Sequence, residues 1–381
     1  MMSTLDVGIV GGSLDSAVGR AHRTALIMDG RFRISAACFS QDFEITQATA
    51  GQWHLPKCRL YQDWQTMLDD EHDRIDALVV LTPPSMHMPI ILKAFTLGIR
   101  VISEKPLCLS SAEAAEIKAS QVSNNGYLAV IYNYTGYPMV RELRAQIAAG
   151  RLGKLVHVRA EMPQEGFIRA KPDSGEVPVP QDWRLQDNEI PTVSLDLGVH
   201  LLQMITFLTG ARPKRVVGTQ HSYGAFAPLI DSVDALVDYG DDLSCNVWFG
   251  KAALGYRNGL KIRVFGTEGA AEWSQMNPEL IRMTDKFGES VSIDRSGEVL
   301  VAMEDRYQRF KAGHPAGFIE ALANYYEDIY SSIQHVKEGT DAQNEYTAGV
   351  DISFEGLKVL EAISRSKGSP VMLEELEPPS E

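Results

Sequence analysis

Apolar positions in the first third of this 381-residue chain fall into short runs separated by helix-like patterns. Residues 77–82 read ALVVLT and contain no alternating polar position, which predicts a strand buried on both faces. Val18, Ala21, Ala25 and Met28 recur at spacings of three and four, which predicts one apolar face of a helix. Further strands are predicted at residues 6–10, 33–39, 100–103 and 127–132, and a helix at 90–97. Strands that alternate with helices at this spacing predict a parallel sheet covered on both faces.

The pattern changes in the second part of the chain, where polar and apolar positions alternate. Residues 155–162 read LVHVRAEM, and such alternation is typical of antiparallel strands with one solvated face. Similar segments occur at residues 215–217, 235–239, 243–249, 261–265 and 291–293. Helical patterns occupy residues 315–332 and 346–366. Residues 166–187, rich in Pro, Asp and Gln, are predicted to form a long functional loop. We therefore predict an α/β domain at residues 1–128 and an α+β domain with an open, largely antiparallel sheet at 129–381.

The composition narrows the class of protein. Hydrophobic residues make up 44% and charged residues 23% of the chain, the balance of a globular protein. A formal net charge of −14 argues against nucleic-acid binding and against an anionic membrane surface, because both need a basic face. The four cysteines include no C-x-x-C pair, and neither a secretory pattern nor an apolar run of about 18 residues is evident. We expect a cytoplasmic protein with reduced cysteines.

A glycine-rich turn, GIVGGSLDSAVG, follows the first predicted strand and opens the first predicted helix. Glycines in this context let a backbone approach a pyrophosphate, which also gains from the helix N-terminus. The spacing does not fit G-x-G-x-x-G, because Ser13, Leu14 and Asp15 follow Gly11 and Gly12. Asp15 would repel a phosphate if it pointed inward. This turn by itself fits a dinucleotide site and an ordinary strand-to-helix turn equally well.

The tip of the second predicted strand bears on the choice of dinucleotide. An acid is expected there to hold the ribose hydroxyls. Residues 39–44 read FSQDFE, so Ser40 occupies the expected position and Asp42 and Glu44 lie just beyond it. The tip contains no Arg or Lys that would bind a 2′-phosphate. These residues favour NAD and leave NADP as the second possibility.

Charged residues stand directly after a predicted buried strand, in the stretch VISEKPLCLS. Glu104 and Lys105 are costly so close to an apolar strand end, and Pro106 cannot donate a main-chain hydrogen bond. Ligands of parallel sheets bind outside the carboxyl ends of the strands, and Thr82 and Pro83 occupy the same place after another strand. An ion-paired turn would explain the isolated tripeptide, but its position predicts the rim of a binding crevice.

A second group of polar residues lies in the stretch SLDLGVHLLQ. Asp196 and His200 are four residues apart, so on a helix they share one face. Gly210 fits the C-cap of that helix. An Asp–His pair at this spacing is commonly structural, and the pair by itself leaves a structural and a catalytic role open.

Taken together, these residues resemble the glucose-fructose oxidoreductase / inositol dehydrogenase (Gfo/Idh/MocA) family over nearly the whole chain. The resemblance rests on the strand-Gly-Gly start, on Glu-Lys-Pro at 104–106 and on Asp-x-Gly-x-His at 196–200, in this order. Further matches are residues 82–87 (TPPSMH), 133–134, 183–184 and 347–351 (TAGVD). The stretches NYTGYP and GHPAG are similar to a branch that includes levoglucosan dehydrogenases.

The resemblance implies a fold and an activity. Residues 1–128 would form a Rossmann-type NAD(P)-binding domain, and residues 129–381 an α+β domain for substrate binding and oligomerisation. The activity would be an NAD(P)-dependent oxidation of a secondary hydroxyl of a sugar, sugar derivative or cyclitol, or reduction of the ketone. The expected partners are this small-molecule substrate and further copies of the chain, in a homodimer or homotetramer. A cis peptide before Pro106 is also implied.

Candidate site residues follow from the resemblance and from the positions above. Lys105, Asp196 and His200 match the catalytic positions, with Lys105 or His200 as the base. The candidate cofactor-binding residues are Gly11, Gly12, Ser13, Ser40, Thr82, Pro83, His87, Glu104, Lys105, Asn133, Trp183 and Arg184. The candidate substrate-binding residues are Lys105, Tyr134, Gln164, Asp196, His200 and His314. No set of His, Cys and carboxylate residues has metal-ligand spacing, so no metal is expected.

Some residues depart from the family pattern, and two other functions stay open. Ser13 and Asp15 alter the glycine loop, and Thr135 stands where many members carry Arg. An altered loop suits an enzyme that retains NAD and uses transient oxidation for elimination, hydrolysis or epimerisation of a sugar. A non-catalytic sensor of cofactor or sugar is the other alternative, disfavoured because all three candidate catalytic residues are present.

Overall fold

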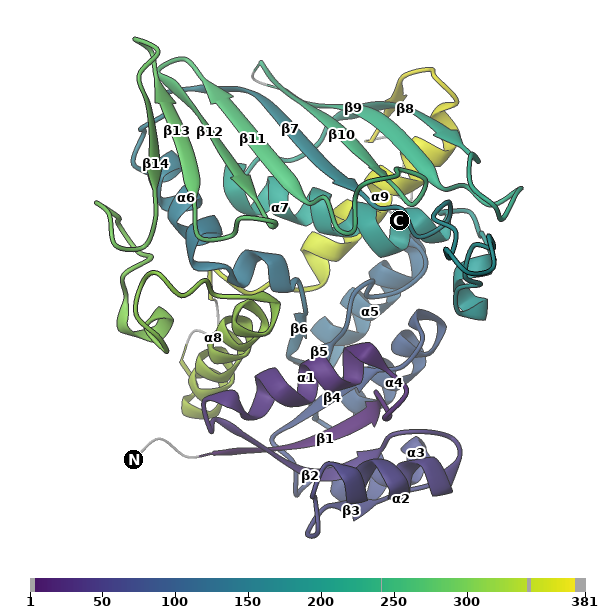
Figure 1. The fold of residues 1–381 in the computed structure, drawn as a ribbon. Helices are drawn as coiled ribbons and strands as arrows, with labels where there is room; N and C mark the ends of the chain where they lie inside the picture. The colour runs from purple at the N-terminus through teal and green to yellow at the C-terminus, as the bar shows by residue number, and fades with distance from the viewer. Residues whose placement is uncertain (1–3, 241, 341–343, 374–381) are drawn as a thin grey trace. The chain divides into compact units, whose positions relative to one another are not determined.

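The computed structural model describes residues 4–240, 242–340 and 344–373, which form two compact units (Figure 1). The first unit comprises Met1–Gly136 and Phe318–Phe354, and the second comprises Tyr137–Gly317 and Glu355–Glu381. Residues 318–354 therefore fall in the first unit, although they follow the second unit along the chain. The functional division at residues 128/129 stays a prediction. No helix among the described residues is long and apolar enough to cross a bilayer.

A six-stranded parallel sheet forms the centre of the first unit, as predicted. Its strands, in the order β3-β2-β1-β4-β5-β6, are Arg59–Leu60, Phe32–Cys38, Leu5–Gly11, Ala77–Leu81, Arg100–Ser103 and Leu128–Val130. Every residue of β4 is buried, which explains its unbroken apolar run. The strand order reverses direction between β1 and β4, and ligands of such sheets bind beyond the carboxyl ends of the strands at this reversal.

Helices cover both faces of this sheet. They are α1 (Ala17–Met28), α2 (Phe43–Gln52), α3 (Trp64–Glu71), α4 (His87–Thr96), α5 (Ser111–Ser123) and α8 (Phe318–Glu338). The connections β1→β2 and β4→β5 run in opposite directions along the sheet, and both are expected to be right-handed, so α1 and α4 lie on opposite faces. Helix α8 packs against α1, and α5 packs against α4. The buried residues of α1 are Gly19, His22, Ala25 and Leu26, so the predicted apolar face was wrong at Val18 and Met28, which are 44% and 37% exposed.

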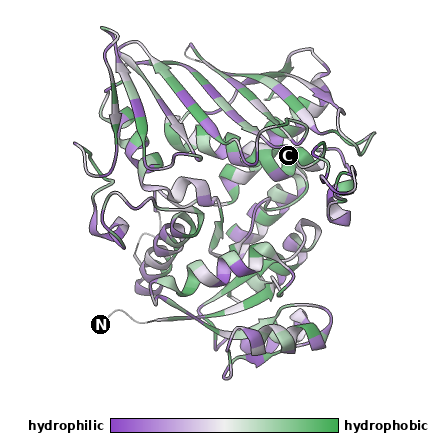
Figure 2. Ribbon diagram, in the orientation of Figure 1, coloured by the Kyte–Doolittle hydropathy of each residue, from purple (hydrophilic) through white to green (hydrophobic). Residues whose placement is uncertain are grey.

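The second unit is built on a nine-stranded sheet that is antiparallel except where β7 pairs with β10. Its strands are β7 (Leu155–Pro163), β8 (Arg215–His221), β9 (Ser232–Gly240), β10 (Leu243–Gly250), β11 (Lys261–Gly266), β12 (Gly269–Ser274), β13 (Ile281–Asp285), β14 (Ser290–Ile293) and β15 (Val371–Met372). Buried and exposed residues alternate along β9, and Figure 2 shows the same alternation of hydropathy along the strands. The largely antiparallel sheet is thus confirmed, although β12 and β13 were not predicted.

In the part of the chain that the structure describes, the helices that contact the nine-stranded sheet lie on one of its faces (Figure 1). Helix α7 (Val199–Thr209) contacts β7, and α6 (Pro138–Ala148) contacts β12 and α7. The C-terminal part of α9 (Val350–Ser366) lies on the same sheet, where Ser364 Oγ accepts a hydrogen bond from Gln220 of β8. The apolar positions of the strands point to these helices, which is why each strand has one polar and one apolar face.

Candidate active site

The turn after β1 has the backbone geometry of a phosphate-binding loop. Gly11 and Gly12 have φ angles of +82° and +73°, which side-chain-bearing residues rarely adopt. A Cβ atom on Gly11 would lie 2.7 Å from the carbonyl carbon and oxygen of Leu81. Ser16 caps the N-terminus of α1 by accepting a hydrogen bond from the Gly19 N–H at 3.0 Å. The turn can therefore bring its main chain and the positive end of α1 against a pyrophosphate.

Gly19 is a site residue that the spacing rule missed. A Cβ atom on Gly19 would lie 2.0 Å from the carbonyl oxygen of Gly12, so only glycine lets α1 approach the turn so closely. This is the role of the third glycine in a dinucleotide fingerprint. The longer loop holds Ser13, whose carbonyl accepts from Ser16 N–H, while Asp15 is exposed to solvent. The departure in spacing therefore leaves the packing role of the third glycine intact.

The tip after β2 is organised around Ser40. The hydroxyl of Ser40 accepts a hydrogen bond from the Asp42 N–H at 3.1 Å. The main-chain N–H of Ser40 donates to the Thr46 hydroxyl. The carboxylate of Asp42 caps α2 by accepting from the Glu44 N–H at 2.9 Å. Asp42 and Glu44 are both exposed at this tip, so two negative charges surround the position where a ribose hydroxyl or a 2′-phosphate would bind.

The ends of β4 and β5 are tied together by His87. This side chain is 1% exposed, and its two ring nitrogens each lie 2.9 Å from a carbonyl oxygen, Nδ1 from that of Pro106 and Nε2 from that of Thr82. Burial lowers the pKa of His87. In its neutral form the ring donates to one of these two carbonyl oxygens, and the expected contact of His87 with the cofactor stays a prediction. Pro83 begins the short 3-10 turn that leads into α4.

Glu104 and Lys105 follow β5 at the same edge of the sheet as the glycine turn. The carboxylate of Glu104 contacts His22 Nε2 through Oε1 at 2.8 Å and accepts from the Lys105 N–H through Oε2 at 2.9 Å. The Lys105–Pro106 peptide is cis, as the resemblance implied. Glu104 and Lys105 are both partly buried. The Glu104 carboxylate is already engaged by His22 and by the Lys105 N–H, so Lys105 stays the candidate for contact with a substrate at this edge.

Asn133 and Tyr134 lie in a buried 3-10 turn, Asn133–Gly136, that follows β6. The Tyr134 ring makes an edge contact with Phe318 of α8, with ring centroids 6.1 Å apart. Thr135 is fully buried, and its hydroxyl donates to the Tyr132 carbonyl at 2.9 Å. Thr135 thus forms part of the turn's internal structure.

In the second unit, Asp196 lies in a π-helical turn, Ser194–Gly198, that leads directly into α7 and His200. Both side chains belong to buried residues, 8% and 5% exposed. Oδ2 of Asp196 lies 2.5 Å from Nζ of Lys251 and 3.4 Å from Nε of Arg184. Two cations thus surround one buried carboxylate. The π turn was not predicted, and such turns occur frequently at functional sites.

Lys251 is a second residue that sequence reasoning missed. It follows β10 directly, is 7% exposed, and its Nζ lies 5.3 Å from the centre of the Phe167 ring. A single lysine after a strand carries no pattern, and 55 residues separate it from Asp196. The contact is therefore made by the fold alone.

Trp183 and Arg184 occupy a short 3-10 turn, Asp182–Leu185, within the predicted long loop. The guanidinium of Arg184 stacks 4.3 Å from the centre of the Trp183 ring, and Gln181 Oε1 accepts hydrogen bonds from both side chains. Arg184 also reaches Asp196, so a candidate cofactor residue meets a candidate catalytic residue. The loop is thereby attached to the π turn.

Gln164 and His314 have different surroundings. The main chain of Gln164 is paired with Gly250, the residue before Lys251, and its side chain donates to Asn258 at 3.1 Å. His314 is exposed, its ring lies against Phe310, and its carbonyl accepts from a buried arginine. Gln164 is thus hydrogen-bonded to the residue next to Lys251. The contacts of His314 are to residues of its own loop. Among the described residues, no three His, Cys, Asp or Glu side chains are grouped as metal ligands.

Two family models match this chain. One, described as an oxidoreductase family with an NAD-binding Rossmann fold, matches residues 5–132, and a GFO/IDH/MocA C-terminal domain model matches residues 140–272. The chain belongs to this family of oxidoreductases. The predicted family, enzyme class and NAD-binding fold are thereby confirmed, which argues against the non-catalytic sensor.

Individual relatives agree with this assignment. The chain is 28% identical to the uncharacterized oxidoreductase YfiI of Bacillus subtilis over 371 residues, 94% of this chain and 93% of that protein. It is 26% identical to levoglucosan dehydrogenase of Pseudarthrobacter phenanthrenivorans over 216 residues, 55% of this chain and 52% of that enzyme. A solved structure of an inositol dehydrogenase homolog of Azotobacter vinelandii, complexed with NADH and myo-inositol, has a TM-score of 0.86 at 26% identity, and the match covers 97% of this chain and 98% of that chain.

Proposed function

We propose that this protein is an NAD-dependent dehydrogenase that oxidises a secondary hydroxyl of a sugar, a sugar derivative or a cyclitol, or reduces the corresponding ketone. The observation that carries the proposal is the place of Lys105. It follows β5 at the carboxyl edge of the parallel sheet where β1 ends in the glycine turn, with only β4 between the two strands. The myo-inositol in the Azotobacter vinelandii complex and the levoglucosan dehydrogenase relative support this substrate class.

Each candidate residue has a role in this chemistry. Bound NAD supplies the acceptor for the hydride. The ammonium of Lys105 hydrogen-bonds the substrate hydroxyl and stabilises the negative charge that develops on its oxygen as the proton leaves. His200, as a neutral imidazole, would accept the hydroxyl proton while Lys105 stays an ammonium. Lys105 is the alternative base, and it would then have to act as a neutral amine. Asp196, fixed by Lys251 and Arg184, binds a neighbouring hydroxyl of the substrate.

The cofactor in this proposal is NAD in preference to NADP. Asp42 and Glu44 are exposed beside Ser40, and their negative charges would repel a 2′-phosphate. Comparison of kcat/KM for the two cofactors with one substrate tests this preference. A ratio that favours NADP would overturn it.

The dehydrogenase activity is tested with a panel of sugars and cyclitols. The change in nicotinamide absorbance is measured in the direction of oxidation and in the direction of reduction. With one confirmed substrate, Lys105→Met keeps most of the side-chain volume and removes the ammonium. Loss of one such electrostatic contact lowers kcat by on the order of 10² to 10³. The Kd for NAD, measured by calorimetry, should change little, because the pyrophosphate is assigned to the glycine turn.

Lys118→Met is the matched control. Lys118 lies on α5 and forms an ion pair with Asp351 at 2.6 Å, with both side chains at least half exposed, so its loss should leave kcat unchanged. A Lys105→Met variant within about threefold of the wild-type kcat would contradict the catalytic role. Stoichiometric NAD released on denaturation, with product formed and no net reduction, would favour the enzyme that retains its cofactor.

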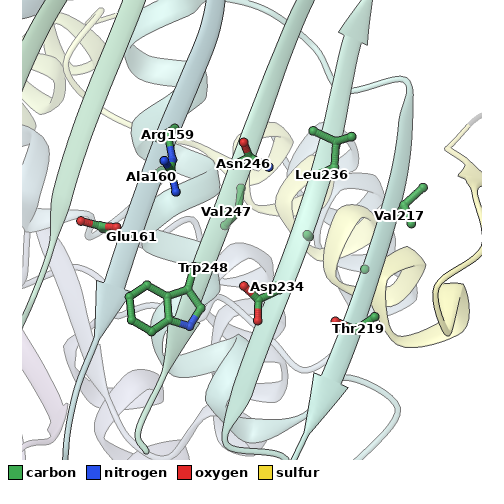
Figure 3. Close-up of a pocket in the computed structure, with 12 residues that line it drawn as sticks. Arg159, Ala160, Glu161, Val217, Thr219, Asp234, Leu236, Asn246, Val247 and Trp248 are labelled. Atoms are coloured by element: carbon green, nitrogen blue, oxygen red, sulfur yellow. The ribbon is translucent and has the colours of Figure 1, made fainter. Parts of the chain in front are cut away.

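We also propose that the open face of the nine-stranded sheet joins copies of the chain into a homodimer or homotetramer. This face carries a hollow of about 570 Å³ over β7 to β10, where Figure 3 shows Leu236, Asp234 and Trp248 on neighbouring strands. Leu236, one of the residues that line this hollow, is 47% exposed. Leu236→Glu should lower the molar mass measured by light scattering, whereas Val122→Glu, at a 76% exposed position on α5, should not. A monomeric wild type would refute the proposal.

A further inference from the structure

Three polar side chains in the first unit, two of them buried and one partly buried, form a continuous hydrogen-bonded row that ends at the main chain of Lys105. The hydroxyl of Tyr326, on α8, lies 2.6 Å from His22 Nδ1, and His22 Nε2 lies 2.8 Å from Glu104 Oε1. The second carboxylate oxygen of Glu104 accepts the Lys105 N–H at 2.9 Å. His22 is 2% and Tyr326 1% exposed, so these bonds are shielded from water. We name these residues, Tyr326, His22 and Glu104, the positioning row.

The chemistry of its members fixes the direction of every bond in the row. Burial raises the pKa of Tyr326 well above its usual range, so its hydroxyl keeps its proton and can donate to His22 Nδ1. A carboxylate only accepts, so His22 Nε2 carries the proton that it donates to Glu104. Of the two neutral tautomers of His22, only the Nε2–H form gives both neighbours a hydrogen-bond partner, and we assign this form. The row is then fully satisfied, as a buried polar network must be to be stable.

The row connects the two features that the proposed reaction needs. His22 lies three residues after Gly19 on α1, and both residues are on the buried face of this helix. Glu104 directly precedes Lys105, and one of its oxygens holds the main-chain N–H of that lysine. A rotation of the Glu104 carboxylate would therefore move the Lys105 main chain. In active sites a misplacement of about 1 Å can cost about 10²-fold in rate.

We propose that His22 and Tyr326 are positioning residues for Lys105, acting through Glu104. This inference rests on the proposed function, in which Lys105 contacts the substrate hydroxyl. His22 touches neither substrate nor cofactor in this scheme. It keeps Glu104 in the one orientation that accepts the Lys105 N–H, and Tyr326 keeps the imidazole in the form that donates to Glu104. If the row served stability alone, substitution of one of its members would lower the melting temperature. It would not produce a loss of kcat that depends on the presence of Lys105.

Variants of His22 separate positioning from stability. His22→Leu removes the donor to Glu104 and should lower kcat by about 10- to 100-fold. His22→Gln has a side-chain amide long enough to replace the Nε2–H donor, so it should retain most of the kcat that His22→Leu loses. Tyr326→Phe removes one hydroxyl and should lower kcat by about 3- to 10-fold. Arg31→Met is the control, because the Arg31–Glu327 ion pair also holds α8 but does not reach Glu104, and it should leave kcat unchanged.

The decisive measurement repeats His22→Leu and Tyr326→Phe in a Lys105→Met background, with melting temperatures recorded for every variant. If the row acts through Lys105, these substitutions have no further effect on the residual kcat once the ammonium is gone. Equal fold-losses in both backgrounds, or a His22→Leu kcat within about twofold of wild type, would overturn the inference and leave the dehydrogenase intact. A Lys105→Met variant with wild-type kcat would overturn the catalytic role itself and the positioning role with it. If His22→Leu does not fold, Tyr326→Phe, which removes a single oxygen atom, decides between the same outcomes.

Discussion

Lys251→Met tests how the fold holds the Asp196 carboxylate. In the native protein Lys251 Nζ lies 2.5 Å from Asp196 Oδ2, and the two side chains are 9% and 11% exposed. Methionine occupies a similar volume and can keep the packing against Phe167, so little cavity is created. The substitution therefore removes one of the two cations that contact the Asp196 carboxylate. Arg184, at 3.4 Å, stays beside it.

The magnitude follows from the burial of the pair. Removal of one partner of a buried ion pair costs about 3–5 kcal/mol, because the other charge stays desolvated. Arg184 still compensates part of this charge, so we expect about 3 kcal/mol, the lower end of that range. For a domain of about 150–250 residues this lowers the melting temperature by about 6–12 °C. Replacement of both charges, in Lys251→Met with Asp196→Leu, should recover most of the lost stability, because the buried carboxylate is gone. Arg184, whose side chain is 27% exposed, keeps its contacts with Gln181 and Trp183.

The assay is differential scanning calorimetry, which resolves separate transitions if the two units unfold separately. Lys261→Met is the matched control on the same sheet, since Lys261 pairs with Glu272 at 2.8 Å with side chains 30% and 35% exposed. An exposed pair of this kind contributes about 0–1 kcal/mol. If Lys251→Met melts within about 2 °C of this control, the ion pair does not have the energetic role assigned to it.

Further predictions concern other parts of the chain. Gly19→Ala should raise the Kd for NAD by about tenfold and lower the free energy of unfolding by about 1–3 kcal/mol, because the new Cβ meets the Gly12 carbonyl. Calorimetry measures both quantities. Gly51→Ala is the control, because a Cβ at Gly51 meets nothing within 4 Å. Glu142→Gln should cost about 2–3 kcal/mol in thermal unfolding, since the fully buried carboxylate accepts from the main-chain N–H groups of residues 300–302. Burial raises the pKa of three thiols, so they stay protonated at pH 8 and should react with a thiol reagent far more slowly in the folded than in the unfolded protein. Between about pH 9 and pH 11 the unfolded chain releases these protons first, so the free energy of unfolding should fall as pH rises. The pKa is raised to about 11 for Cys38 and to about 12 for Cys58 and Cys245.

Local sequence patterns determined the elements of this protein and their class of sheet. Residues 77–82 read as a doubly buried strand because the first five side chains are all apolar, and β4 is buried throughout. The alternation in residues 155–162 likewise predicted β7 with its open face. Periodicity identifies such segments because burial of one face repeats every two residues in a strand and about every 3.6 in a helix. The segment β12, GAAEWS, was missed because its small residues carry little of this signal.

Sequence motifs also gave the candidate residues, but only tertiary structure decided which side chains meet. The glycine turn, Lys105 and the Asp196–His200 spacing are local features, readable from neighbouring letters. By contrast, Lys251 meets Asp196 across 55 residues, His22 meets Glu104 across 82, and Tyr326 meets His22 across 304. No periodicity links such positions, because their proximity depends on strand order and on how α8 packs against α1. A single lysine or histidine therefore acquires its role only when the folded chain surrounds it with a carboxylate and excludes water.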